Sequence, residues 1–103
     1  MILSVLVVQG CPNADEALAN ARIAASTVDG VTVQQSIVTS EEQAHAARFA
    51  GSPSFQLDGT DLFPGAGVGL SCRLYRSHAT VTGCPSADEV AEALSRALLG
   101  DRG

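Results

Sequence analysis

The feature that most constrains the fold is the apolar run from Ile2 to Val8, which is followed by Gly10-Cys11-Pro12. Nearly every position of the run is apolar, which is typical of a strand covered on both faces. We therefore expect this run to be the central strand of a sheet. A helical pattern begins directly after it, so Cys11 is expected at the junction between a strand and a helix.

Cys11-Pro12 is the first candidate for a reactive site. Proline is common at the first helical position, and Pro12 in that position would make Cys11 the N-cap. A cysteine there lies near unpaired backbone N–H groups and the positive end of the helix dipole, and both favour the thiolate. The alternative is that Cys11 is a small buried apolar residue. We favour the reactive interpretation because Cys11 follows the apolar run and does not lie inside it.

Length and composition restrict the class of protein. A chain of 103 residues is expected to form a single domain over 1–103. The net charge of −5 and the pI near 4.7 argue against a nucleic-acid-binding protein. The N-terminal apolar run is too short for a membrane span and lacks the basic start of a signal peptide, so we expect a cytoplasmic protein. Three cysteines, an odd number, do not make a structural disulfide framework.

The first half of the chain predicts alternating helices and strands. Apolar residues recur at helical spacing from Leu18 to Val28, and Asp29-Gly30 ends that helix. Alternation over Val31–Ile37 predicts a strand nearer an edge, parallel to the first. A capping-box pattern at Ser40–Gln43 predicts a short helix that runs through Phe49.

The second half predicts two further strands and a last helix. Ser52-Pro53 directly precedes an alternating strand over Phe55–Asp58, and residues 60–69 are expected to form a long connection. Leu70–Tyr75 alternates as a fourth strand. A second capping box at Ser86–Glu89 opens the last helix. The predicted order is β-α-β-α-β-β-α.

This order resembles the thioredoxin superfamily in its compact, glutaredoxin-like form, because Cys11-Pro12 follows the first strand and Ser52-Pro53 precedes the third. The resemblance implies an α/β fold with a four-stranded mixed sheet flanked by three helices. It also implies that Cys11 is the reactive cysteine, and that the bond before Pro53 is cis with the proline beside the sulfur. A cis X-Pro bond exposes the preceding backbone, so Ser52 is expected to pair with a substrate like an added strand. The alternative is a trans proline at the start of a strand.

The sequence departs from this family at the second cysteine of its Cys-x-x-Cys motif, which reads Cys11-Pro12-Asn13-Ala14. Ala14 cannot resolve a mixed disulfide. This leaves monothiol exchange, a resolving cysteine elsewhere, or loss of activity.

Cys84 is the candidate resolving cysteine, because Thr82-Gly83-Cys84-Pro85 leads into the last helix. The reasoning applied to Cys11 would also lower the pKa of Cys84. An exposed cysteine without a redox partner is the alternative. In glutaredoxin-like proteins a glycine-containing turn at this place helps to hold glutathione, which implies that role for Gly83, Ser86 and Asp88.

Three other candidates have simpler interpretations. Cys72 shares a strand face with Leu70 and Leu74, so we expect a buried packing residue. His45, beside alanines on a helix, is expected to be solvated. His78 has two interpretations, a proton donor near the thiols or, more simply, a surface residue.

The leading hypothesis is a cytoplasmic thiol-disulfide oxidoreductase that needs no cofactor and takes glutathione as a co-substrate. Its partner would be a thiol or disulfide protein or a small thiol, with no role for nucleic acid or a membrane. The catalytic residues would be Cys11 and Cys84, and the substrate-binding residues Pro12, Ser52, Pro53 and Gly83. One alternative is a thiolate site for Cu(I), Zn or a mercurial, with Asp15 or His78 nearby. Another is a redox-inactive interaction module on the same scaffold.

Overall fold

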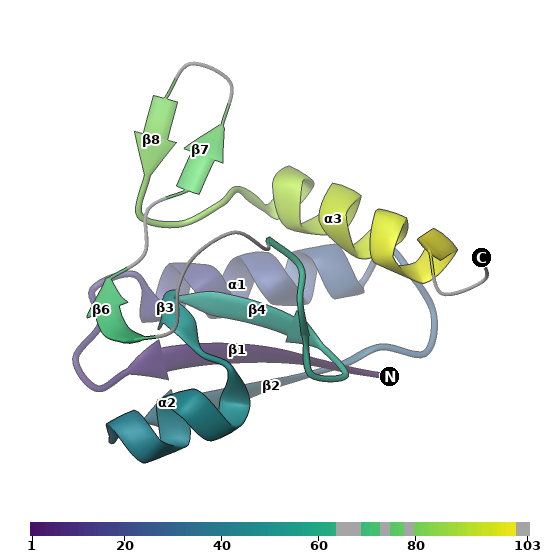
Figure 1. Cartoon of the computed structure of the whole chain (residues 1–103). Coiled ribbons are helices and arrows are strands. Elements are labelled where there is room, and N and C mark those ends of the chain that lie inside the picture. Colours follow the sequence, from purple (N-terminus) through teal and green to yellow (C-terminus); the bar gives the residue numbers. More distant parts are fainter. Residues whose placement is uncertain (64–68, 73–74, 78–79, 101–103) are drawn as a thin grey trace.

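A computed structural model describes residues 1–63, 69–72, 75–77 and 80–100 (Figure 1). Its main sheet has four strands in the order β2-β1-β4-β5. β1 is parallel to β2 and antiparallel to β4, and β4 is antiparallel to β5. The strands of this sheet are β1 (Ile2–Val8), β2 (Thr32–Val38), β4 (Ser54–Leu57) and β5 (Thr60–Asp61). The apolar run at the N-terminus therefore forms an interior strand of the sheet, as its composition predicts.

The three helices cover opposite faces of this sheet, with α1 and α3 on one face and α2 on the other (Figure 1). The larger core lies between β1, β4, α1 and α3 and includes the fully buried Leu3, Val5 and Phe55. The smaller core packs Leu6 against Phe49 near α2. Each fully buried large apolar side chain contributes roughly 1.5–3 kcal/mol through the hydrophobic effect. The helices are α1 (Ala14–Ala25), α2 (Glu41–Ala47) and α3 (Ala87–Gly100).

The fourth strand of the sheet is β5 and not the predicted strand at Leu70–Tyr75. Asp58 and Gly59 both have positive φ, 50° and 88°, and join β4 to β5 by a two-residue turn. Turns with two positive φ angles match the twist of a hairpin, so the chain pairs with itself at once. Residues 60 and 61, expected to begin a long connection, are therefore in the sheet.

The segment predicted as the fourth strand lies in two small separate ladders. β6 (Gly69–Cys72) pairs in parallel with β3 (Ala50–Ser52), and β7 (Tyr75–Ser77) pairs antiparallel with β8 (Thr80–Thr82). The parts of the predicted strand at 70–72 and at Tyr75 are extended, and residues 73 and 74 lie outside the described residues. The alternation does not specify which strand becomes the partner.

α2 ends at Ala47, two residues before the predicted end. Arg48 adopts a left-handed conformation with φ 54°, and the Phe49 N–H donates to the Ala44 carbonyl at 2.8 Å. This is the hydrogen bond of a Schellman ending, in which an apolar residue folds back on the last turn. Phe49 consequently packs beside Ala44 in the smaller core instead of extending the helix. No helix in the described ranges has the length and apolarity needed to cross a membrane.

Candidate functional site

Cys11 lies in the turn between β1 and α1. Its N–H donates to the Val8 carbonyl at 3.2 Å, and its carbonyl accepts from the Ala14 N–H at 3.2 Å. Gly10 supplies the positive φ, 76°, that this turn requires. The Cys11 side chain is half-buried and packs against the edge of the larger core. A partly accessible thiol therefore lies at the carboxyl end of the interior strand, as predicted.

The helix begins later than predicted, so Cys11 is not its N-cap. α1 starts at Ala14 with Asn13 as N-cap, and Pro12 is an exposed turn residue and not the first helical residue. The reason is that the backbone first makes a turn across Cys11. The first helical hydrogen bond comes after it and runs from the Ala17 N–H to the Asn13 carbonyl at 2.9 Å. The influence of the helix dipole falls off within about one turn, so Cys11 lies at the margin of that effect.

The Ser52–Pro53 bond is cis, as the resemblance implied, and it lies at the same end of the sheet as Cys11. The Val8 N–H donates to the Ser52 hydroxyl oxygen at 3.1 Å, and Val8 also accepts the bond from Cys11. On the other side of the proline, Ser54 pairs with Leu6 of β1. Val8 thus connects the cysteine turn directly to the segment that contains Pro53.

The expected exposure of Ser52 is not observed. Ser52 and Pro53 are both fully buried, and β6 lies along β3 with Cys72 in register with Ser52. The chain itself therefore occupies the backbone edge that was expected to receive a substrate strand. A substrate role for Ser52 and Pro53 stays a prediction, and it requires β6 to move or the substrate to approach from another side.

Cys84 lies in the segment that leads into α3 and is buried, with 9% of its surface exposed. Its Sγ donates to the Pro85 carbonyl at 3.4 Å, and the Asn20 amide donates to that carbonyl at 2.9 Å and to Sγ at 3.8 Å. Cys84 belongs to the larger core, against which Cys11 also packs.

The prediction of a lowered pKa for Cys84 is wrong. Burial raises the pKa of the Cys84 thiol to about 11, and the charges of Glu16, Cys11 and Glu89 act in the same direction. The hydrogen bond from Asn20 opposes them. At Cys84, desolvation of the buried sulfur outweighs any benefit from the helix terminus.

Gly83 and Asn13 show how closely the Cys84 segment approaches the Cys11 turn. A Cβ atom at Gly83 would lie 2.5 Å from Nδ2 of Asn13, which is closer than real Cβ contacts. Glycine is therefore required for the present position of the Asn13 side chain. This contact and the influence of the Cys11 charge on Cys84 both indicate that the two predicted catalytic cysteines lie at the same end of the sheet.

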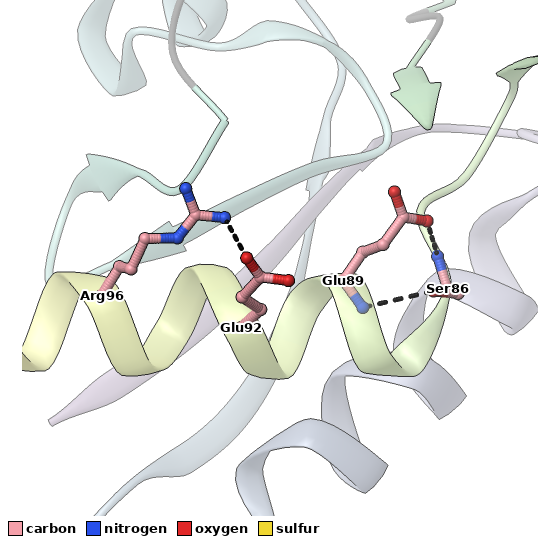
Figure 2. Close-up of polar contacts among 4 residues, drawn as sticks. All are labelled: Ser86, Glu89, Glu92 and Arg96. Carbon is pink, nitrogen blue, oxygen red and sulfur yellow. Dashed lines mark hydrogen bonds and ion pairs between the residues drawn. The ribbon is translucent and has the colours of Figure 1, made fainter. Parts of the chain in front are cut away.

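The N-terminus of α3 is closed by a capping box, as the sequence predicts (Figure 2). The Ser86 N–H donates to a Glu89 carboxylate oxygen at 3.0 Å, and the Glu89 N–H donates to the Ser86 hydroxyl oxygen at 3.2 Å. The Glu89 carboxylate thus takes up the backbone N–H of Ser86, a residue that the resemblance assigned to glutathione binding. Asp88, assigned the same role, is exposed. A carboxylate of glutathione bound at this helix terminus would be repelled by the negative charge of Glu89.

The remaining candidates are outside the site or outside the described residues. His45 is exposed on α2, as predicted. His78 and the side chain of Cys72 lie outside the residues that the structure describes. Within the described part of the chain, no three His, Cys, Asp or Glu side chains come together as a metal site.

Sequence reasoning missed Asn13 and Asn20, which contact the Cys84 segment from α1. A signal for Asn20 was present, because asparagine in an alanine-rich helix interior lowers helix propensity and calls for a compensating contact. Asn13 had no comparable signal, since asparagine is common at helix starts.

Comparisons with known proteins identified no relative of this chain. The sequence matches no protein-family model, and searches of curated proteins and of solved structures gave no significant match.

Proposed function

We propose that this protein is a thiol-disulfide exchange protein in which Cys11 attacks the substrate disulfide and Cys84 resolves the mixed disulfide. The observation that carries the proposal is the meeting of three segments at one end of the sheet. The Cys11 turn is tied through Val8 to the segment of Pro53, and Gly83 beside Cys84 packs on Asn13 of the same turn.

The fold supports a thioredoxin-like, compact glutaredoxin-like interpretation. The interior strand is parallel to β2 and antiparallel to β4, and the cis proline directly precedes β4. Two helices cover one face and the short α2 covers the other. These features support the proposal, although the fourth strand of the sheet differs from the predicted one and the Cys-x-x-Cys motif is replaced.

The chemistry proceeds in two exchanges. The Cys11 thiolate attacks one sulfur of a disulfide R–S–S–R′, so the Cys11–SR bond forms as the S–S bond breaks, and R′S⁻ leaves and takes up a proton. Cys84 then loses its proton and attacks the Cys11 sulfur, which releases RS⁻ and forms the Cys11–Cys84 disulfide. The substrate is reduced by two electrons and the protein is oxidised by two. Two molecules of an external thiol such as glutathione then reduce the Cys11–Cys84 disulfide by two successive exchanges and leave as their own disulfide.

The division of roles follows from the two environments. Cys11 is half-buried and reachable by a substrate, whereas Cys84 is in the core with its pKa raised to about 11. A thiol that is protonated at neutral pH competes poorly for external disulfides. It still reacts with a disulfide formed beside it, because the neighbouring sulfur is held at high effective concentration.

Exchange kinetics test the proposal. Without added glutathione, the loss of glutathione from a glutathionylated peptide is followed after mixing with the reduced wild-type protein, Cys11→Ser or Cys84→Ser. We expect Cys11→Ser to remove the catalysed rate, and Cys84→Ser to retain attack while the glutathione adduct on Cys11 accumulates. A Cys11→Ser protein with the wild-type rate would refute the proposal.

The proximity of the two cysteines also favours a second candidate, a site for a soft thiophilic ion such as Cu(I). Titration of the reduced protein with Cu(I), read by native mass spectrometry, separates the two functions. One ion per chain that is lost in both Cys11→Ser and Cys84→Ser would favour metal binding over exchange.

A further inference from the structure

Asn20 links the middle of α1 to the segment before α3. Its partly buried amide Nδ2 donates to the Pro85 carbonyl at 2.9 Å and lies 3.8 Å from the sulfur of Cys84. The Cys84 thiol in turn donates to the same carbonyl at 3.4 Å. The three groups form one closed cluster, and Pro85 itself is fully buried.

The chemistry of this cluster differs between the two protonation states of Cys84. A side-chain amide carries two N–H donors, so Asn20 can serve the carbonyl and the sulfur at once. In the thiol state the S–H proton is directed at the Pro85 carbonyl. Once that proton has left, the negatively charged sulfur accepts hydrogen bonds more strongly, and the Asn20 amide is placed to donate one.

We propose that Asn20 is the positioning residue of Cys84, which fixes the sulfur through Pro85 and stabilises its thiolate for attack on the mixed disulfide. The proposal rests on the proposed function for its place in the reaction. The groups that surround the sulfur agree with this role. Glu16 on α1, Cys11 in the turn after β1 and Glu89 on α3 all disfavour a charged Cys84, whereas the hydrogen bond from Asn20 favours it.

An anchoring role and a thiolate-stabilising role have effects of opposite sign. If Asn20 only anchors the segment, its removal exposes Cys84 and speeds up reaction with an external reagent. If Asn20 stabilises the thiolate, its removal raises the pKa of Cys84 and slows the reaction at every pH below that pKa.

Alkylation of Cys84 distinguishes these roles. The rate at which iodoacetamide alkylates Cys84 is measured from pH 7.5 to 9.5 by peptide mapping. The proteins compared are Cys11→Ser itself and the same protein with Asn20→Leu or, as the control, Glu16→Gln. Asn20→Leu keeps the approximate shape of the side chain and removes its donors, and Asn20→Ala replaces it if that variant does not fold. We expect the alkylation rate to be roughly three- to tenfold lower without the amide, because the thiolate loses one hydrogen bond of ordinary strength. Glu16→Gln should raise the rate, because it removes a charge that opposes the thiolate.

An unchanged or higher rate without the Asn20 amide, with Glu16→Gln still faster, would overturn the proposal. This measurement does not depend on exchange activity, so its outcome is separate from that of the proposed function. With Cys11 present, Asn20→Leu should slow the release of glutathione from the Cys11 adduct and leave formation of that adduct unchanged. Equal slowing of both steps would also contradict the positioning role.

Discussion

At the scale of single residues, Cys11 and Cys84 are both followed by proline but lie in different environments. Cys11 is at the accessible end of the interior strand, whereas Cys84 is in the larger core and near the carboxylates of Glu16 and Glu89. Burial of this kind depends on which distant segments pack around a residue. The Cys-Pro pair is the same at both positions, so the local sequence could not distinguish their environments.

The raised pKa of Cys84 predicts a loss of stability at alkaline pH. The pKa of this thiol rises from 9.0 to about 11 on folding, so the folded state holds the proton more tightly than the unfolded state. The resulting stabilisation is complete below pH 9 and is lost as the pH rises to about 11, with a magnitude on the order of 2 kcal/mol. Urea unfolding at pH 8 and pH 10.5 measures it, with Cys84→Ala as the control. The wild-type protein should lose more stability between these two pH values than Cys84→Ala, and equal losses would contradict the assignment.

At the scale of elements, the capping box of α3 gives a direct prediction (Figure 2). Ser86→Ala removes the hydroxyl that accepts from the Glu89 N–H, which should lower the free energy of unfolding by about 1 kcal/mol. The matched control is Ser95→Ala on the exposed side of the same helix, where alanine should leave stability unchanged or slightly higher. Urea denaturation measures both changes. Equal effects of the two substitutions would show that the box does not stabilise the helix start.

The elements show what local sequence can specify. Both capping boxes mark the starts of their helices correctly, because Ser and Glu or Gln make hydrogen bonds within four residues. At α2 the side-chain oxygen Oε1 of Gln43 accepts from the Thr39 N–H and not from the Ser40 N–H, a shift of one residue that the pattern does not reveal. The end of α2 and the two-residue strand β5 were missed, since a left-handed Arg48 and a strand of two residues leave no periodic pattern.

At the scale of the whole molecule, the α/β class and the three helices were predicted from the sequence, and the resemblance implied a mixed four-stranded sheet. The fourth strand of that sheet is β5 and not the predicted segment. The apolar run and the helical periods are strong signals, and they place Cys11 at the correct end of the sheet. The pairing of β6 with β3, the burial of Ser52 and the approach of Gly83 to Asn13 were not predicted. Each of them joins segments that are far apart in the chain, so no local pattern encodes it.

The most direct test of the account is a map of the disulfide that forms when the reduced protein is oxidised with limiting glutathione disulfide. Peptide mass spectrometry identifies the bonded cysteines after rapid acid quenching. The account predicts a Cys11–Cys84 disulfide in the wild-type protein and glutathione on Cys11 in Cys84→Ser. A wild-type protein in which glutathione stays on Cys11 with Cys84 reduced, or in which Cys11 pairs with Cys72, would contradict it.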